Sequence, residues 1–138
     1  MKKTLKPFKG LDNIEFGMPI AKVQELVNIK ESKVTNKYLN ESKVFDDKIA
    51  YVFNDDVLVT FELEYQEGIY FNDVDIFNIK DTDELLKGFK IESKKDNIHV
   101  KELGLILIGF KKKDVTKRVI WFYSKEMLIE YETFLDVV

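Results

Sequence analysis

The segment 57–65, VLVTFELEY, constrains the fold most, because its apolar and polar side chains alternate. A period of two predicts a β-strand with Val57, Val59, Phe61, Leu63 and Tyr65 on one face and Thr60, Glu62 and Glu64 on the other. One apolar face and one solvent-exposed face are typical of a strand in an antiparallel sheet. The chain therefore contains at least one sheet that covers a core on one side.

Four more segments read as strands: KIAYVFN (48–54), GIYFNDVDIF (68–77), NIHVKELGLILIGF (97–110) and KRVIWFYS (117–124). Turn signals join neighbouring strands at NDD (54–56) and KKKDVT (111–116). A further short strand is expected within 11–16. Residues 28–40 are expected to form a polar loop with some strand around 37–39.

Helices are predicted at 16–27, 81–89 and 126–138. In the first, Gly17 allows a turn and Pro19 suits the first helical turn, where its missing N–H costs nothing. In the second, Asp81 is a good N-cap, Glu84 has the capping-box spacing and Gly88 ends the helix. Short turns favour antiparallel pairing, so the predicted class is α+β, a mostly antiparallel sheet with helices packed on one face. The order of elements also allows two helix-plus-hairpin units.

The composition indicates one packed domain over residues 1–138. Of the 138 residues 45% are hydrophobic, and there is no cysteine, so disulfides, thiol nucleophiles and cysteine zinc sites are excluded. The basic N-terminus lacks the apolar run of a signal peptide, and no apolar stretch approaches the roughly 20 residues that cross a bilayer. We expect a soluble cytoplasmic protein without a membrane partner.

Residues 117–124 have apolar side chains on both predicted faces, with Val119, Trp121 and Tyr123 expected inward and Ile120 and Phe122 opposite. Such a strand is either central and covered on both sides, or part of an interface. His99 is the only histidine, which excludes catalytic triads and multi-histidine metal sites. We expect it at a sheet edge or on the surface.

Charge is unevenly distributed along the chain. Residues 41–84 hold thirteen acids and three lysines, a net charge of −10, whereas the remaining 94 residues carry a net charge of +7. The acids do not follow the calcium-loop pattern of an EF-hand, and Asp81 and Glu84 are explained by capping. Asp73 and Asp75 are expected to share one strand face. The acidic segment is thus either a solvated sheet face, a surface for a basic partner, or, as a third interpretation, the source of a catalytic carboxylate pair.

The basic segment KKKDVTKR (111–118), together with Lys2, Lys3, Lys6 and Lys9, is the counterpart of these acids. A nucleic-acid surface would need a strongly basic domain, whereas this chain has a pI near 5.3. We therefore expect a solvated turn and no nucleic-acid partner. The glycines have no phosphate-binding spacing, so no nucleotide loop is predicted.

The string IEFGMPIAKVQELV resembles the x-G-M-x-x-x-x-V-x-x-L opening of a loose group of small bacterial α+β proteins, and segments from 51 to 124 look similar to other members in the same order. Members are often immunity proteins of toxin–immunity systems, including contact-dependent growth inhibition. The stretch VNIKES departs from the G-x-P that many members have after the first helix. The group has no catalytic position to transfer, and without a lipobox cysteine the related lipoproteins do not fit.

This resemblance implies an immunity-type protein that neutralises a basic toxin, such as a nuclease, without enzymatic activity, cofactor or metal. A concentrated acidic surface would suit that role, because it speeds encounter with a basic partner. The residues expected to face the partner are Asp55, Asp56, Glu62, Glu64, Glu67, Asp73 and Asp75. The alternative is a general cytoplasmic interaction or regulatory module without a toxin. The oligomeric state stays open.

Overall fold

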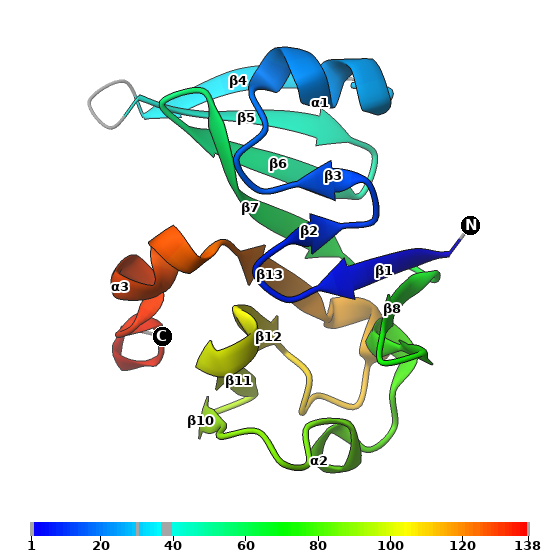
Figure 1. Cartoon of the computed structure of the whole chain (residues 1–138). Helices are drawn as coiled ribbons and strands as arrows, with labels where there is room; N and C mark the ends of the chain where they lie inside the picture. The colour runs from blue at the N-terminus through cyan, green and yellow to red at the C-terminus, as the bar shows by residue number, and fades with distance from the viewer. Residues whose placement is uncertain (1, 30, 37–39, 138) are drawn as a thin grey trace.

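The computed structural model describes residues 2–29, 31–36 and 40–137, and an eight-stranded antiparallel sheet dominates it. The strand order is β10-β11-β12-β13-β7-β6-β5-β4 (Figure 1). The bounds are β4 Glu31–Asn36, β5 Glu41–Asp46, β6 Ile49–Asn54, β7 Val57–Glu64, β10 Glu92–Lys94, β11 Asn97–Val100, β12 Leu105–Ile108 and β13 Val119–Tyr123. The α+β class with a mostly antiparallel sheet is confirmed.

A small sheet lies against one face of the large one, in the order β3-β2-β1-β8-β9. Its strands are β1 Lys3–Lys6, β2 Gly10–Leu11, β3 Ile14–Glu15, β8 Ile69–Phe71 and β9 Val74–Asp75. Strands β1 and β8 pair in parallel, and the other pairs are antiparallel. The helices are α1 Ile20–Leu26, α2 Thr82–Leu85 and α3 Leu128–Tyr131, with short 3-10 helices η1 Ile76–Asn78, η2 Lys101–Leu103, η3 Val115–Lys117, η4 Lys125–Met127 and η5 Phe134–Asp136.

The element order repeats once along the chain. A two-stranded hairpin (β2–β3), α1 and the four strands β4 to β7 are followed by a second hairpin (β8–β9), α2 and the four strands β10 to β13. The final strands of the two halves, β7 and β13, pair antiparallel at the centre of the large sheet. The chain thus repeats helix and strands twice, as the sequence allows, but four strands follow each helix where the predicted unit has one hairpin.

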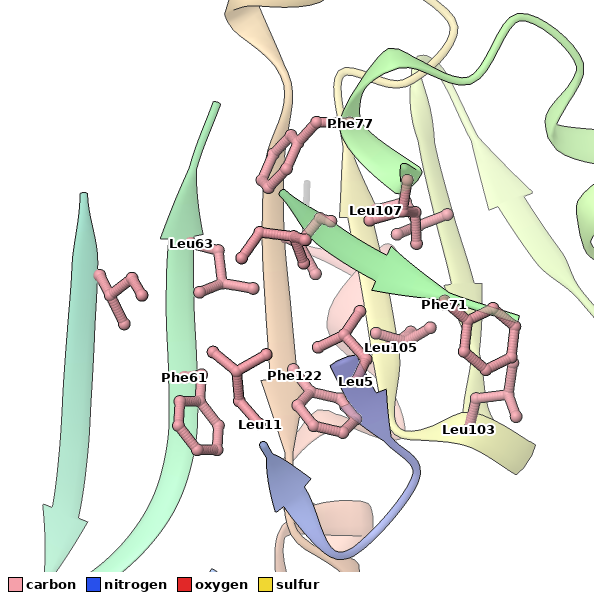
Figure 2. Close-up of a cluster of buried hydrophobic side chains, with 14 of the residues drawn as sticks. Leu5, Leu11, Phe61, Leu63, Phe71, Phe77, Leu103, Leu105, Leu107 and Phe122 are labelled. Atoms are coloured by element: carbon pink, nitrogen blue, oxygen red, sulfur yellow. The ribbon is translucent and has the colours of Figure 1, made fainter. Parts of the chain in front are cut away.

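The main core lies between the two sheets, on what we call the inner face of the large sheet. Figure 2 shows Leu5 and Leu11 of the small sheet against Phe61, Phe122 and Leu105 of the large one. Phe61 and Phe122 are fully buried, and their ring centroids lie 5.9 Å apart. Val23 of helix α1 and Leu86, the residue directly after α2, belong to the same core. The inner face thus carries α1, α2 and the small sheet.

The opposite, outer face has a second and smaller core under the C-terminal segment. Val52, Val59, Ile106, Tyr123 and Met127 form it, and Leu128 and Tyr131 of α3 pack against them. The expectation that all helices share one face is therefore corrected for α3. The reason is β13, which presents Ile120 and Phe122 to the main core and Tyr123 to the outer one. Strand β13 is central and covered on both sides, which confirms that alternative over an interface position. The face that packs on the main core carries Ile120 and Phe122, instead of the predicted Val119, Trp121 and Tyr123.

Several predicted elements are confirmed and others are split by turns. Strand β6 and strand β13 lie where the sequence places them, and Asp81 Oδ1 accepts the N–H of Glu84 at 3.2 Å as the N-cap of α2. Helix α1 begins at Ile20 instead of residue 16, and Pro19 is its extended N-cap instead of a residue of the first helical turn. Segment 97–110 is two strands joined at Gly104, which has φ 64° and leaves no room for a Cβ beside the Tyr123 carbonyl. The closing helix is reduced to α3, flanked by 3-10 turns.

The expected loop 28–40 contains β4, and its suggested strand around 37–39 lies outside the described residues. In β7 the predicted face also needs correction. A register irregularity opposite Val52 and Phe53 leaves Val59 without a Cα partner, so Leu58 joins Phe61 in the main core while Val59 belongs to the outer one. Such bulges reverse the alternation locally.

Candidate partner-binding site

A groove of about 220 Å³ lies on the outer face of the large sheet, beside the C-terminal segment. Cross-strand pairing builds its floor, because Trp121 on β13 is opposite Glu62 on β7, Glu62 is opposite Ala50 on β6, and Ala50 is opposite Phe45 on β5. Directly opposed residues project to the same face of a sheet. The groove, which we call the Trp121 groove, is thus fixed by the register of four adjacent strands.

Trp121 is half-buried and held from one side only. Its ring centroid lies 5.3 Å from that of Phe134 and 6.0 Å from that of Tyr131, both in the C-terminal segment. Phe134 and Tyr131 pack against the indole, and Trp121 also lines the groove. A fixed, partly exposed tryptophan loses little side-chain entropy when a partner covers it, which is why this residue type is frequent at interface hot spots.

Three acids line the groove: Glu62, which belongs to its floor, and Asp47 and Glu64. Glu62 Oε1 lies 3.0 Å from Lys43 Nζ, and both side chains are mostly buried. Asp47 and Glu64 are exposed and form no ion pair within the described part of the chain. Lys48 is the only base among the lining residues that the structure describes, so the rim is net acidic.

Two of the predicted partner-facing residues, Asp55 and Asp56, form the β6–β7 turn at the opposite end of β7 from Glu64. Both have positive φ, 50° and 64°, as a two-residue type I′ turn requires. Asp56 Oδ1 accepts the N–H of Ile20 at 3.2 Å, and Asp55 Oδ1 accepts from Asn40 Nδ2 at 2.9 Å. The Asp56 carboxylate connects the turn to the start of α1, and the Asp55 carboxylate connects it to the residue before β5, so both have a structural role.

Three others, Glu67, Asp73 and Asp75, belong to the small sheet and its approach. The predicted strand 68–77 is a hairpin, because Asn72 and Asp73 have positive φ and form a turn. Asp73 and Asp75 therefore do not share a strand face. Asp75 accepts hydrogen bonds from Gly68 N–H at 3.3 Å and Asn78 Nδ2 at 3.4 Å, whereas Asp73 is 95% exposed and 3.7 Å from Lys2.

The seven predicted residues are thus distributed over three places: the β6–β7 turn, the outer face of β7, and the β8–β9 region. Only Glu62 and Glu64 line the Trp121 groove. The sequence did not indicate Asp47 and Phe45 as members of this site, because no strand is predicted in the segment 41–47, which contains β5. The DDK turn signal before IAYVF was the available hint that a hairpin, and hence a strand before it, precedes β6.

His99 is not at an edge or on the surface, as expected, but 1% exposed beneath the C-terminal segment. Its Nε2 and the Tyr123 hydroxyl oxygen are 2.7 Å apart, and Nδ1 has no hydrogen-bond partner. Burial, together with the positive charge of Lys101, lowers the pKa of His99 below its ordinary value, while Glu92 acts in the opposite direction. The imidazole is therefore a neutral group of the outer core.

We expect this histidine to make the fold sensitive to mild acid. Because the pKa of His99 is lower in the folded than in the unfolded chain, the unfolded state binds more protons. The stabilising contribution of neutral His99 is therefore fully present above pH 6.5, the pKa of histidine in the unfolded chain. As the pH falls from there towards the pKa of the folded state, the free energy of unfolding decreases by at most about 1.4 kcal/mol per pH unit. Urea unfolding of the wild type and of His99→Gln, repeated over a range of about 2.5 pH units from ~pH 7.5 down to ~pH 5, measures this loss of stability. Parallel pH dependences of the two proteins would contradict it.

Two carboxylates outside the 41–84 segment have a lowered pKa. The pKa of Glu92 is lowered chiefly by its hydrogen bond to Lys101, and that of Asp114 by hydrogen bonds from Thr116. Both groups lie on the surface and neither lines the groove, so they do not bear on the carboxylate pair that the sequence allows within 41–84. Within residues 2–29, 31–36 and 40–137, no three His, Cys, Asp or Glu side chains are grouped to hold a metal ion.

Comparison with known proteins adds no identity: no family model, curated protein or solved structure matches the chain. No helix in the described part of the chain is long and apolar enough to cross a membrane.

Proposed function

We propose that this chain is an immunity-type binding protein that neutralises a basic toxin, and that the toxin docks on the Trp121 groove. The observation that carries the proposal is the combination of a half-buried tryptophan with Asp47, Glu62 and Glu64 around it. Protein interfaces typically have an aromatic anchor at the centre and charged residues at the rim. The groove provides both on a rigid sheet.

The charge of the groove favours a basic partner. Three acids line it, against one base, Lys48. An acidic field raises the rate of encounter with a basic surface and orients it before contact. A basic protein surface, such as that of a nuclease, is therefore the occupant that fits best.

The sequence resemblance to small bacterial immunity proteins supports the proposal that the basic partner is a toxin. The same groove would serve a general interaction module whose basic partner is not toxic. Toxicity of the partner separates the two functions, because only an immunity protein restores growth.

The test is co-expression with the C-terminal portion of the protein encoded directly upstream. We expect that fragment to stop growth alone, and this chain to restore growth and to co-purify with it, less well at high salt than at low salt. A fragment that is harmless, or that kills in spite of this chain, would contradict the immunity function. Repeating the test with Trp121→Ala, together with a measurement of its folding, asks whether the groove is the site.

A further inference from the structure

A second and larger cavity, of about 880 Å³, lies between the η1–α2 segment and the loop that joins β12 to β13. Five cationic side chains line it, against one acid, Asp83. They are Lys80, Lys111, Lys112, Lys113 and Arg118. It has no lining residue in common with the Trp121 groove. Its volume is within the range of small-molecule sites, roughly 300–1,000 Å³.

Arg118 is the buried member of this cationic set, only 6% exposed. Its Nη1 donates to the carbonyl oxygens of Phe77 at 3.0 Å and Ile79 at 2.8 Å, and its Nη2 donates to that of Phe110 at 3.1 Å. The guanidinium also lies over the Phe110 ring, 4.8 Å from its centroid. Arg118 thus joins the two walls of the cavity, since Phe77 and Ile79 precede α2 and Phe110 begins the β12–β13 loop.

The charge of Arg118 is not neutralised by any residue that the structure describes. No carboxylate in the described part of the chain forms an ion pair with it, and its Nε has no hydrogen-bond partner. Three carbonyls accept from three of the five guanidinium N–H donors, so one Nη2 N–H and the buried Nε–H have no acceptor within the described residues. A buried, unpaired cation is costly unless an anion completes its environment.

The four lysines add to the same positive field. Lys80, Lys111, Lys112 and Lys113 are exposed, and none of them forms an ion pair within the described residues. Arginine binds oxyanions through paired N–H donors, and flexible lysines neutralise further charges around them. This arrangement goes beyond the solvated turn that the sequence predicts for residues 111–118.

We propose that the cavity binds a small ligand with a chain of two or more phosphate groups, with one phosphate on Arg118 and the others among the lysines. The excess of five cations over one acid suits a multiply charged anion better than a single carboxylate. The volume also accommodates a nucleoside polyphosphate, so the phosphate chain is the chemistry that free polyphosphates and nucleotides would share. The site is independent of the partner-binding function.

Titration with sodium pyrophosphate, tripolyphosphate and ATP at constant ionic strength tests the proposal, by calorimetry and by the NMR signal of Arg118 Nε–H. We expect saturable binding, a shift of that signal, and at least tenfold weaker binding for the variant Lys111→Gln/Lys112→Gln/Lys113→Gln. The matched control, Lys87→Gln/Lys94→Gln/Lys125→Gln, removes the same charge from exposed lysines outside the cavity and should bind like the wild type.

Equal affinity for ATP and tripolyphosphate would identify the phosphate chain alone as the ligand, and tighter binding of ATP would identify a nucleotide. Both results support the site. Absence of binding, an unmoved Nε–H signal, or equal weakening by the two triple variants would overturn it. Because these lysines are exposed, none of the outcomes depends on a variant that fails to fold.

Discussion

Phe122→Ala is expected to lower the free energy of unfolding by about 3–5 kcal/mol, the usual cost of truncating a fully buried phenylalanine. Phe122 is 0% exposed, and its ring centroid lies 5.3 Å from Phe16 and 5.9 Å from Phe61. It is on β13, which pairs with β7 where the two halves of the large sheet meet. The cavity left by the ring would open at the junction between the halves (Figure 2).

Urea denaturation of wild type and variant measures this loss. Ile129→Ala is the control, since Ile129 is 84% exposed and its truncation should change stability by no more than about 0.5 kcal/mol. A loss below about 1 kcal/mol for Phe122→Ala would mean that the site is not packed as described. The comparison separates removal of buried apolar surface from the general effect of shortening a side chain.

The second large effect is expected on association with the partner. Removing charge at the rim with Asp47→Asn/Glu64→Lys should slow association about 10- to 100-fold at low salt, because electrostatic steering contributes factors of this order. Asparagine is chosen at residue 47 because the position has φ 52°, which asparagine tolerates well. Both side chains are exposed, so stability should change little. Stopped-flow mixing at several salt concentrations gives the rates.

The control variant Glu67→Lys/Glu126→Gln makes the same change in net charge at exposed positions outside the groove. It includes Glu67, one of the seven residues predicted from sequence. We expect its rate to stay within a few-fold of the wild type, since long-range charge has a smaller effect than the rim. If both variants slowed association equally, the groove would have no special part in steering.

Local patterns were enough to predict several elements. Strand β6 and strand β13 follow from short apolar runs between turn residues, and the N-cap Asp81 follows from its spacing to Glu84. Each of these signals acts within a few residues, so it needs no knowledge of the rest of the fold. The α+β class follows from them, because short turns force antiparallel pairing.

Long-range effects decided what the sequence did not predict. His99 is buried because the C-terminal segment covers the outer face, and nothing near residue 99 indicates this. Val59 changes face because of an irregularity in its pairing with β6. The candidate site depends on register in the same way, since Trp121, Glu62, Ala50 and Phe45 meet only when four strands align.

Acidity along the chain was also a poor guide to acidity on one surface. Asp55, Asp56 and Asp73 are in tight turns, where positive φ favours aspartate and asparagine whatever the function. The Asp75 carboxylate accepts hydrogen bonds from Gly68 and Asn78 within the fold. A count of charges does not distinguish these residues from Glu64, whose carboxylate is free to meet a partner.

The central claim is that a partner covers Trp121, and the chain has no other tryptophan. Incorporation of 5-fluorotryptophan into this chain alone therefore gives a single 19F NMR signal that reports on the groove. On addition of the unlabelled basic toxin fragment, the account predicts that this signal shifts and becomes less accessible to a soluble paramagnetic agent. A stable complex in which the signal keeps its position and its accessibility would contradict the account.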